Sequence, residues 1–520
     1  MNKTLLALLL GASLTANAQQ IETIVVVGNS TELELVDQIE VTSLIESLQP
    51  TQVSTVGGIG GFASFTERGT QASHTAVFRN GVMANDAGAG WYDIGHDLAT
   101  GNEQVRVVTG PQGVLYGTSS MGGTVFINDK LTPGFTAKAG NNIYMASATL
   151  SDNINFTYAD VDNGSVRSDN TESDQYTQTS VRLQSDPLWN NFVVNYSVTD
   201  YSYDYDNCYT AEWTASNDCV QQGLRQTLSA RNDNITLGYN ANTVEYFTAD
   251  YQSYDTDADS YYFDARDKLY SGASFSVLMG ITATQEKYIG ETQSSLETYA
   301  LVSYQDWLDF GARYTDDTTV ARVGVNALGA TITASTSYRN PNLYELNGDG
   351  AWVFANTSLQ PEKGVGLEMT YSALTVFRYE FSQGIDFNFT NSTYVNTGEY
   401  QTQGIRFNDT YAIAGGELSV FAGYTDTDQL RVPEYKYAIT YTKHVGDYQF
   451  RVNHVVQNNR GQDWNGEQLE DVSSSDVFVS YQFQSFSVSG GIENLFNNDY
   501  QIAPGYNNRG QQIVLTVTTK

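Results

Sequence analysis

The side chains best suited to chemistry in this sequence are aspartates that recur at every second position. Asp160 and Asp162 form one such pair, and Asp204 and Asp206 form another. Carboxylate oxygens are hard ligands, which Ca²⁺ accepts and softer metals do not. The sequence predicts a calcium site on acidic loops that carry Asp160, Asp162, Asp169, Asp174, Asp204 and Asp206, with Asp255, Asp257 and Asp259 further along. The alternative is a solvated acidic surface, because 26 Lys and Arg face 59 Asp and Glu, a net charge of −33.

Two cysteines, Cys208 and Cys219, lie in the polar and aromatic stretch YSYDYDNCYTAEWTASNDCVQQ. If the chain passes through an oxidising compartment, this pair favours a disulfide, which would close a short loop and contribute about 3 kcal/mol. A pair of free thiols is the alternative. A metal site would need more ligands than two cysteines without a nearby histidine.

The histidines give little support to an enzyme. His74, His96, His444 and His454 lie outside any recognisable nucleophile or metal motif. We expect each of them to serve as an ordinary hydrogen-bonding residue. The sequence therefore predicts no catalytic residue and no covalent cofactor, and it disfavours a hydrolase.

Composition restricts both the partners and the fold. Binding to nucleic acid depends on a basic footprint, which a chain of net charge −33 lacks. The chain is 12% aromatic and contains 36 Tyr and 45 Gly but only 8 Pro and 6 Met. Aromatic side chains fit a pleated surface, so a folded, β-rich protein is expected.

The N-terminal residues 1–18, MNKTLLALLLGASLTANA, have the layout of a secretory signal with cleavage after Ala18. Their apolar stretch runs from Leu5 to Leu14, about half of the ~20 residues that a membrane-spanning helix needs. Since no later apolar run reaches that length, an exported chain of this kind is either soluble or a membrane barrel.

Beyond about residue 136, apolar and polar residues alternate with a period of two. Clear examples are residues 192–199, 385–390 and 477–484 and the hairpin 437–456. A soluble sandwich would alternate in the same way, but repetition over nearly 400 residues, with tyrosines at strand ends, favours a barrel. If residues 137–520 supply 22 strands, each strand and its connection have about 17 residues, enough for a membrane strand of ~9–11. The acid-rich stretches 160–174, 201–222 and 254–268 are then expected to be the longer loops.

Motifs in both halves of the chain point to one family. ERGTQASHTAVFRNGVMANDAGAG and NEQVRVVTGPQGVLYGTSSMGGTVFIN precede the alternating region, SYRNPNLYEL and NTSLQPEKGVGLEMTYS lie within it, and GGIENLFNNDYQIAPGYNNRGQQIVLTV ends it. Together they resemble TonB-dependent outer-membrane receptors. The resemblance implies an all-β membrane protein, a large antiparallel transmembrane barrel of about 22 strands with an N-terminal α+β plug domain in its lumen. The turn signal Asn80-Gly81 agrees with a compact plug sheet.

The resemblance also implies a division of the chain. Residues 1–18 would be the signal peptide, 19–30 the TonB box and linker, 31–136 the plug, and 137–520 the barrel. The TonB box would consist of Glu22, Thr23, Ile24, Val25, Val26 and Val27, an extended segment that can add a strand to the energy-coupling protein TonB. The alternative for this segment is the first strand of the plug. Further implied partners are outer-membrane lipids and the barrel assembly machinery, and we expect a monomer that crosses the outer membrane many times.

Two departures from the family pattern stand out. Arg106 occupies a position where the family usually has Glu, and Thr109 one where it usually has Arg. Since those family residues pair with the barrel wall, an ionic contact between plug and barrel is in doubt. The chain also ends in Thr518-Thr519-Lys520 rather than in the aromatic residue usual for barrel assembly.

Within the family, the chain looks most like the cobalamin transporters, through RGTQASH, a short plug and the closing GYNNRGQQ. That branch uses calcium in its outer loops. The resemblance would place substrate contacts at Phe62, Ala63, Ser64, Asn85, Ala89, Gly90 and Trp91. A ferric-siderophore receptor is the main alternative, and a passive porin or an exported adhesin is more remote. A porin would not need the plug-like section or the TonB box.

Overall fold

The computed structural model describes residues 30–34, 40–42, 45, 52–167, 169, 171–248, 251–272, 274–305, 307–315, 318–349, 352–463 and 466–519. The predicted signal peptide at 1–18 and the predicted TonB box at 22–27 lie outside these residues. Within the described ranges, no helix combines the length and the apolar character that crossing a bilayer requires.

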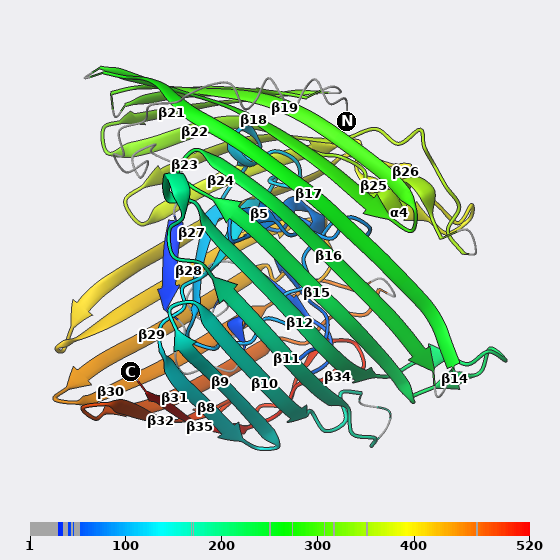
Figure 1. Cartoon of the computed structure of the whole chain (residues 1–520), viewed down its shortest axis with the longest axis vertical. Helices are drawn as coiled ribbons and strands as arrows, with labels where there is room; N and C mark the ends of the chain where they lie inside the picture. Colours follow the sequence, from blue (N-terminus) through cyan, green and yellow to red (C-terminus); the bar gives the residue numbers. More distant parts are fainter. Residues whose placement is uncertain are drawn as a thin grey trace.

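A closed antiparallel barrel of 22 strands forms the wall of the molecule, which confirms the predicted fold class (Figure 1). Its first strand begins at Gly134, three residues before the expected boundary, because residues 134–136 already pair with the next strand and Thr136 also pairs with the last one. The strands, in the order in which they pair, are β8 (Gly134–Gly140), β9 (Ile143–Ser151), β10 (Ile154–Asp162), β11 (Gln175–Gln184), β12 (Val193–Tyr205), β15 (Cys219–Arg231), β16 (Ile235–Thr248), β17 (Tyr251–Ser271), β18 (Phe275–Tyr288), β19 (Glu291–Tyr304), β20 (Leu308–Tyr314), β21 (Thr319–Ala327), β22 (Ala330–Arg339), β23 (Glu362–Tyr371), β24 (Leu374–Ser382), β27 (Tyr400–Ile413), β28 (Gly416–Thr427), β29 (Tyr435–Val445), β30 (Tyr448–Asn458), β31 (Val472–Gln482), β32 (Phe486–Glu493) and β35 (Gln512–Thr519).

The period-two alternation separates the two faces of this wall. On the β29–β30 hairpin, Ile439 and Val452 are 44% exposed on the outside, whereas Thr440 and Asn453 are buried toward the lumen. In water, an exterior of apolar side chains would be costly, and in lipid it is favourable. The pattern therefore gives the barrel an apolar outer face and a polar inner face.

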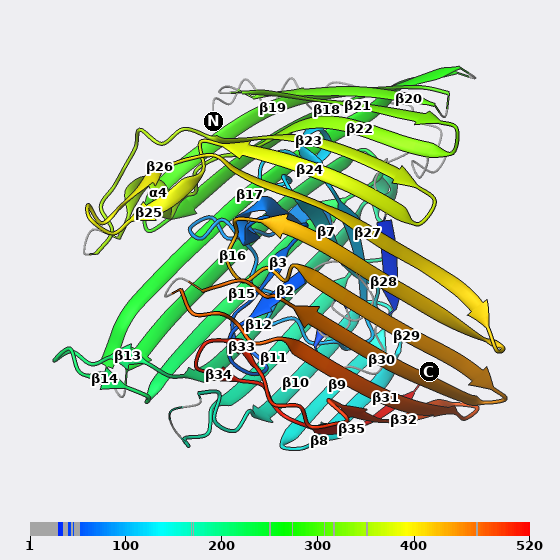
Figure 2. The same cartoon turned by 180° about the vertical axis from the view of Figure 1, so that it is seen from behind.

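The longest connections share one end of the barrel, as Figure 2 shows on its left side. They cover residues 163–174, 206–218, 340–361, 383–399, 428–434, 459–471 and 494–511, and include β13 (Cys208–Tyr209), β14 (Ala215–Ser216), α4 (Leu343–Asn347), β25 (Ile385–Asn388), β26 (Thr393–Asn396), β33 (Gln501–Ala503) and β34 (Tyr506–Asn507). Most connections at the opposite end have two or three residues, and one contains a 3-10 turn, η2 (Trp189–Asn191). Since such barrels have short turns on the periplasmic side, the long connections face outward.

The acid-rich stretch 254–268 is not a loop, contrary to the prediction. It belongs to β17, the longest strand at 21 residues, which pairs with β16 and β18 along most of its length. Asp255 and Asp257 are exposed on its outer half. A strand that extends past the lipid into water needs no apolar side chains there, so its acidic composition resembles that of a loop.

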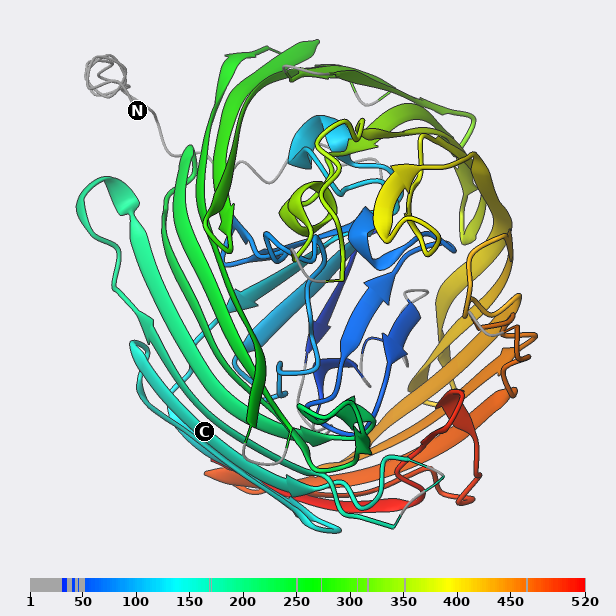
Figure 3. The same ribbon diagram turned by 90° about the vertical axis from the view of Figure 1, so that its right-hand side faces the viewer.

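The plug fills the lumen, as the end-on view in Figure 3 shows. Its five-stranded sheet has the order β1 (Ser30–Glu34), β6 (Glu103–Thr109), β7 (Gly123–Asp129), β4 (Thr75–Arg79) and β5 (Val82–Met83). A separate hairpin of β2 (Gln52–Thr55) and β3 (Ala63–Thr66), the 3-10 turn η1 (Ala72–His74) and the short helix α3 (Gly113–Tyr116) complete it. The β4–β5 hairpin turns at Asn80 and Gly81, whose positive φ angles of 48° and 84° fit the predicted two-residue turn.

Candidate functional site

A cavity of about 300 Å³ lies between the plug and the outward end of the barrel. Its floor is the plug loop 84–93, which follows β5, and its walls are the inner faces of β12 and of β15 to β18. Tyr344 of α4 closes one side, so a long outer connection contributes to the same space. The position of the cavity, above the plug and below the outer connections, is suited to a solute that enters from outside.

Hydrogen bonds fix the plug loop at the floor of the cavity. Asp86 accepts from the backbone N–H groups of Gly88 and Ala89, both at 2.8 Å, which closes a tight turn. Asn85 accepts from the N–H of Val77 at 2.8 Å and donates to the carbonyl oxygens of Thr75 and Gly90. The loop is therefore held in one shape before any solute arrives.

The predicted substrate residues divide into two groups. Asn85, Ala89 and Trp91 line the cavity, as does much of the loop around them. Phe62, Ala63, Ser64 and Gly90 do not line it. Ala63 and Ser64 are buried in the plug, while Phe62 packs edge-on against Trp91 at 4.3 Å between ring centroids and thereby positions that ring.

Tyrosines form much of the cavity wall. Tyr201, Tyr246, Tyr254, Tyr288 and Tyr344 come from five different elements. The hydroxyl groups of Tyr254 and Tyr288 are 3.0 Å apart, and the rings of Tyr288 and Tyr344 meet edge-on at 6.1 Å. Tyrosine combines a flat apolar ring with a polar tip, so these walls can contact a large ring system and bond to its edges.

The cavity has more carboxylates than cations. Its charged lining residues are Asp86, Asp93, Asp259 and Arg225. Arg225 is already engaged, because its guanidinium lies over the Tyr92 ring at 4.8 Å and within 4.0 Å of Asp97. Asp259 pairs with Lys287 at 3.6 Å. Burial raises the pKa of Asp93 to about 6, so this plug carboxylate is ionised above that pH. An incoming anion therefore meets no free guanidinium among these lining residues.

Several lining residues could not be identified from the sequence. Asp86 adjoins the predicted Asn85, but Arg225, Asn240 and Asn242 come from β15 and β16, far away in the chain. They occupy alternate positions of their strands and face inward only because of the barrel register. The sequence signal that could have identified them is the run of polar residues at every second position of these strands.

The acidic residues predicted to hold calcium do not form a preorganised metal site. Asp160 and Asp162 lie on β10, and Asp162 accepts from the N–H of Gly164 at 2.8 Å. Asp169 is exposed and pairs with Arg167 at 3.0 Å. In the described part of the chain, no group of three or more acidic, histidine or cysteine side chains has the arrangement to hold a metal ion. Calcium binding therefore stays a prediction.

For one acidic side chain, the fold nevertheless disfavours the charged form. Asp174 is buried, and burial together with the charges of Asp206, Glu172 and Asp204 raises its pKa to about 7. Only one of its oxygens has a described partner, the N–H of Val166 at 2.9 Å. The fold thus holds carboxylates close together at the outward end of β11 and β12.

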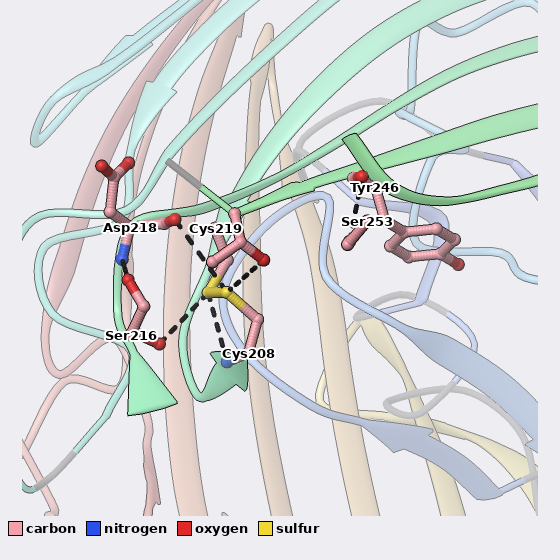
Figure 4. The surroundings of a disulfide bond; sticks show 7 residues. Cys208, Ser216, Asp218, Cys219, Tyr246 and Ser253 are labelled. Carbon is pink, nitrogen blue, oxygen red and sulfur yellow. Dashed lines mark hydrogen bonds between the residues drawn. A yellow bond between two sulfur atoms is a disulfide. The ribbon is translucent and has the colours of Figure 1, made fainter. Parts of the chain in front are cut away.

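A disulfide joins Cys208 and Cys219 across the outer connection between β12 and β15 (Figure 4). Beyond it, the Trp213 ring meets the Trp352 ring edge-on at 5.0 Å between centroids. Trp352 belongs to the connection 340–361, which arises from β22, seven strands around the barrel from β15. Both indoles are more than 60% exposed. The two connections therefore touch through exposed aromatic rings at the mouth.

Buried ion pairs attach the plug to the wall, although not through the residues that the family pattern indicated. Arg106 stacks on Phe126 within the plug, and Thr109 accepts from Arg68 at 2.8 Å. Arg68 in turn pairs with Glu368 of β23. Further plug–barrel ion pairs include Glu67 with Arg406 at 3.2 Å and Glu103 with Arg182, and a hydrogen bond of 2.6 Å joins His74 and Glu362. The doubt raised by positions 106 and 109 is removed, because other charged residues make the contact.

His74, His96 and His454 have structural partners. His74 lies between Glu362 and the Tyr400 hydroxyl, the latter at 2.7 Å from its Nδ1. His96 stacks on Tyr201 at 3.6 Å between ring centroids, and His454 bonds to Ser475 at 2.9 Å.

Comparison with known proteins agrees with this architecture. The family model described as "TonB dependent receptor-like, beta-barrel" matches residues 74–495, and the "TonB-dependent Receptor Plug Domain" matches residues 18–124. The vitamin B12 transporter BtuB of Vibrio cholerae is 24% identical over 97% of this chain and 98% of its own.

Solved structures share the fold at lower identity. A variant of the ferric enterobactin receptor PfeA from Pseudomonas aeruginosa is 13% identical, with a TM-score of 0.71 over 95% of this chain and 99% of its own. The siderophore receptor PirA from Acinetobacter baumannii is 12% identical, with a TM-score of 0.70 over 94% and 98%. Since the barrel model alone matches most of the sequence, this chain belongs to the TonB-dependent receptor family and is a multi-pass transport protein of the outer membrane.

Proposed function

We propose that this receptor imports a cobalamin-type corrinoid through the outer membrane, driven by TonB. The observation that carries the proposal is the cavity above the plug, which combines tyrosine walls with an excess of carboxylates over cations. A corrinoid is a large ring system of little net charge. It can lie against tyrosine rings, and because its net charge is small these carboxylates repel it little.

A ferric siderophore is the alternative substrate. Such chelates usually carry negative charge and are drawn to free Arg or Lys side chains. In this cavity Arg225 is already engaged by Tyr92 and Asp97, while Asp86 and Asp93 would repel an anion. The likeness to BtuB along the whole chain supports the corrinoid, whereas the likeness to siderophore receptors extends only to the fold.

Energy would reach the plug through residues 22–27, the proposed TonB box. An extended, β-branched segment can add as a strand to the sheet edge of a partner, and its backbone hydrogen bonds then transmit force. Buried ion pairs between plug and wall hold the plug in place until TonB supplies that force. Opening a path past the plug is therefore expected to depend on energy from TonB.

Direct binding to the purified receptor in detergent tests the substrate. We expect cyanocobalamin to bind and ferric enterobactin not to bind, each measured by titration calorimetry. Growth of cells in which this receptor is the only route for corrinoid uptake is the matching test in vivo. Binding of the iron chelate without binding of any corrinoid would overturn the proposed substrate and leave the transporter family unaffected.

A further inference from the structure

Two asparagines in the cavity wall have side-chain oxygens without a partner. Asn240 and Asn242 lie at alternate positions of β16 and line the cavity. The Oδ1 atoms of both are buried and accept no hydrogen bond from any described residue. A buried acceptor that is left unsatisfied carries a desolvation cost. A ligand that donates a hydrogen bond to such an oxygen therefore gains binding free energy.

The neighbours of these side chains fix the orientation of each side-chain amide. The Nδ2 of Asn242 donates to a carboxylate oxygen of Asp86 at 3.0 Å, and the Nδ2 of Asn240 donates to the carbonyl oxygen of Met83. A carboxylate and a carbonyl can only accept, so turning either amide around would place two oxygens together. The amide oxygens, and not the amide nitrogens, are therefore the atoms left without a partner.

Two donors near the cavity, on Arg225 and Gln221, are already engaged. The Arg225 guanidinium lies over Tyr92 and beside Asp97, and the amide of Gln221 donates to the Tyr201 hydroxyl at 3.2 Å. With Asp86 and Asp93 also in the lining, the cavity presents hydrogen-bond acceptors in excess. Its complement is a solute that presents N–H donors and carries little net negative charge.

We infer that Asn240 and Asn242 recognise the primary amides on the rim of the solute, by accepting their N–H groups. The inference rests on the proposed function, because the periphery of a cobalamin-type corrinoid carries several such amides. Each amide can donate to one asparagine oxygen while the ring lies against the tyrosines. A site whose acceptors are filled only by the correct solute also rejects analogues that lack the donor.

A thermodynamic cycle between protein and ligand tests the inference. The protein arm compares the wild type with Asn240→Ala and Asn242→Ala, and the ligand arm compares cyanocobalamin with derivatives in which one rim amide at a time is a methyl ester. The ester stays neutral but has no N–H. Asn453→Ala is the matched control, since Asn453 is also a buried asparagine with an unpartnered oxygen but lies on β30, away from the cavity.

We expect each cavity variant to bind cyanocobalamin about tenfold more weakly, and at least one ester to lose about the same factor on the wild type. The two losses should not add, because both remove the same hydrogen bond. Asn453→Ala should bind as the wild type does. Wild-type binding that is equally tight for cyanocobalamin and every ester would overturn the role of the asparagines while the corrinoid stands. Failure of cyanocobalamin itself to bind would overturn both the corrinoid and this recognition.

Discussion

At the scale of single residues, Asp174 is the carboxyl whose charge the fold most disfavours outside the membrane-spanning strands. Its pKa is about 7 in the folded protein against an ordinary value of 3.8, so the folded state holds a proton that the unfolded chain releases. Stability therefore falls as the pH rises from about 4 to 7, and the loss persists above 7. Asp174→Asn keeps an oxygen for the Val166 N–H and removes the charge.

We expect Asp174→Asn to be more resistant to heat than the wild type at pH 8 and equal to it near pH 4. The measurement is the temperature at which the folded form disappears in a heat-modifiability gel. Asp152→Asn is a control, because Asp152 is an exposed carboxylate in the short β9–β10 turn. Equal behaviour of Asp174→Asn and wild type at both pH values would show that Asp174 is ionised without cost.

Calcium can be tested on the same two proteins. An ion bound among Asp174, Asp204 and Asp206 would relieve their mutual repulsion, so calcium at pH 8 should raise the heat resistance of the wild type more than that of Asp174→Asn. A chelator should reverse the gain. If calcium changes neither protein, the acidic loops are a solvated surface.

At the scale of elements, the close approach of the plug hairpin to the wall depends on Gly238 of β16. A Cβ atom at this position would lie 2.1 Å from the Val82 side chain of β5, well inside van der Waals contact. Gly238→Ala should therefore loosen the plug, and faster proteolysis of the plug in folded, detergent-solubilised receptor would reveal it. Gly490→Ala on β32 should have no such effect, because nothing lies within 4 Å of its Cβ position.

The TonB box prediction belongs to the same scale. Proline at Val25 or Val26 removes a backbone donor from the segment that we propose to pair with TonB, while the outer cavity is untouched. Corrinoid uptake by cells should be lost, whereas binding to purified receptor should be unchanged. Uptake at the normal rate in either variant would assign the coupling role to another segment.

Most of the elements, but few of their contacts, could be predicted from the sequence. The presence of membrane strands and the Asn80-Gly81 turn follow from local signals, namely alternation with a period of two and a turn dipeptide, whereas the number of 22 strands follows from the family resemblance. The prediction of a loop at 254–268, within β17, is wrong, because a strand that extends into water loses the apolar face that marks it. Asn85, Ala89 and Trp91, which a family motif predicts as substrate contacts, line the cavity. Arg225 and Asn242 also line the cavity but could not be identified from the sequence, because only barrel closure and register bring them together.

At the scale of the whole molecule, the plug and the barrel are joined by charges buried between them. Glu67 is fully buried and faces Arg406, which is 8% exposed, at 3.2 Å. Removing one partner leaves the other charge buried, which typically costs 3–5 kcal/mol. We expect Arg406→Ala to release the plug and to make cells sensitive to a large hydrophilic antibiotic that the outer membrane excludes.

Arg378→Ala provides the control for this prediction. Arg378 pairs with Glu380 on the same strand, and both side chains are more than half exposed, so the pair contributes little. The double variant Glu67→Gln/Arg406→Ala should restore part of the barrier, because no unpaired charge remains. Equal sensitivity of the Arg378→Ala and Arg406→Ala strains would mean that the buried pair does not retain the plug.

The contact between Trp213 and Trp352 gives this receptor a built-in optical reporter. Two indoles 5.0 Å apart are close enough to alter each other's emission, and both are reached by solvent. A solute that parts the two outer connections on its way in would therefore change the tryptophan fluorescence without any label. Stopped-flow mixing of receptor and solute should then separate the opening of the mouth from the later filling of the cavity, and Trp213→Phe should silence only the first signal.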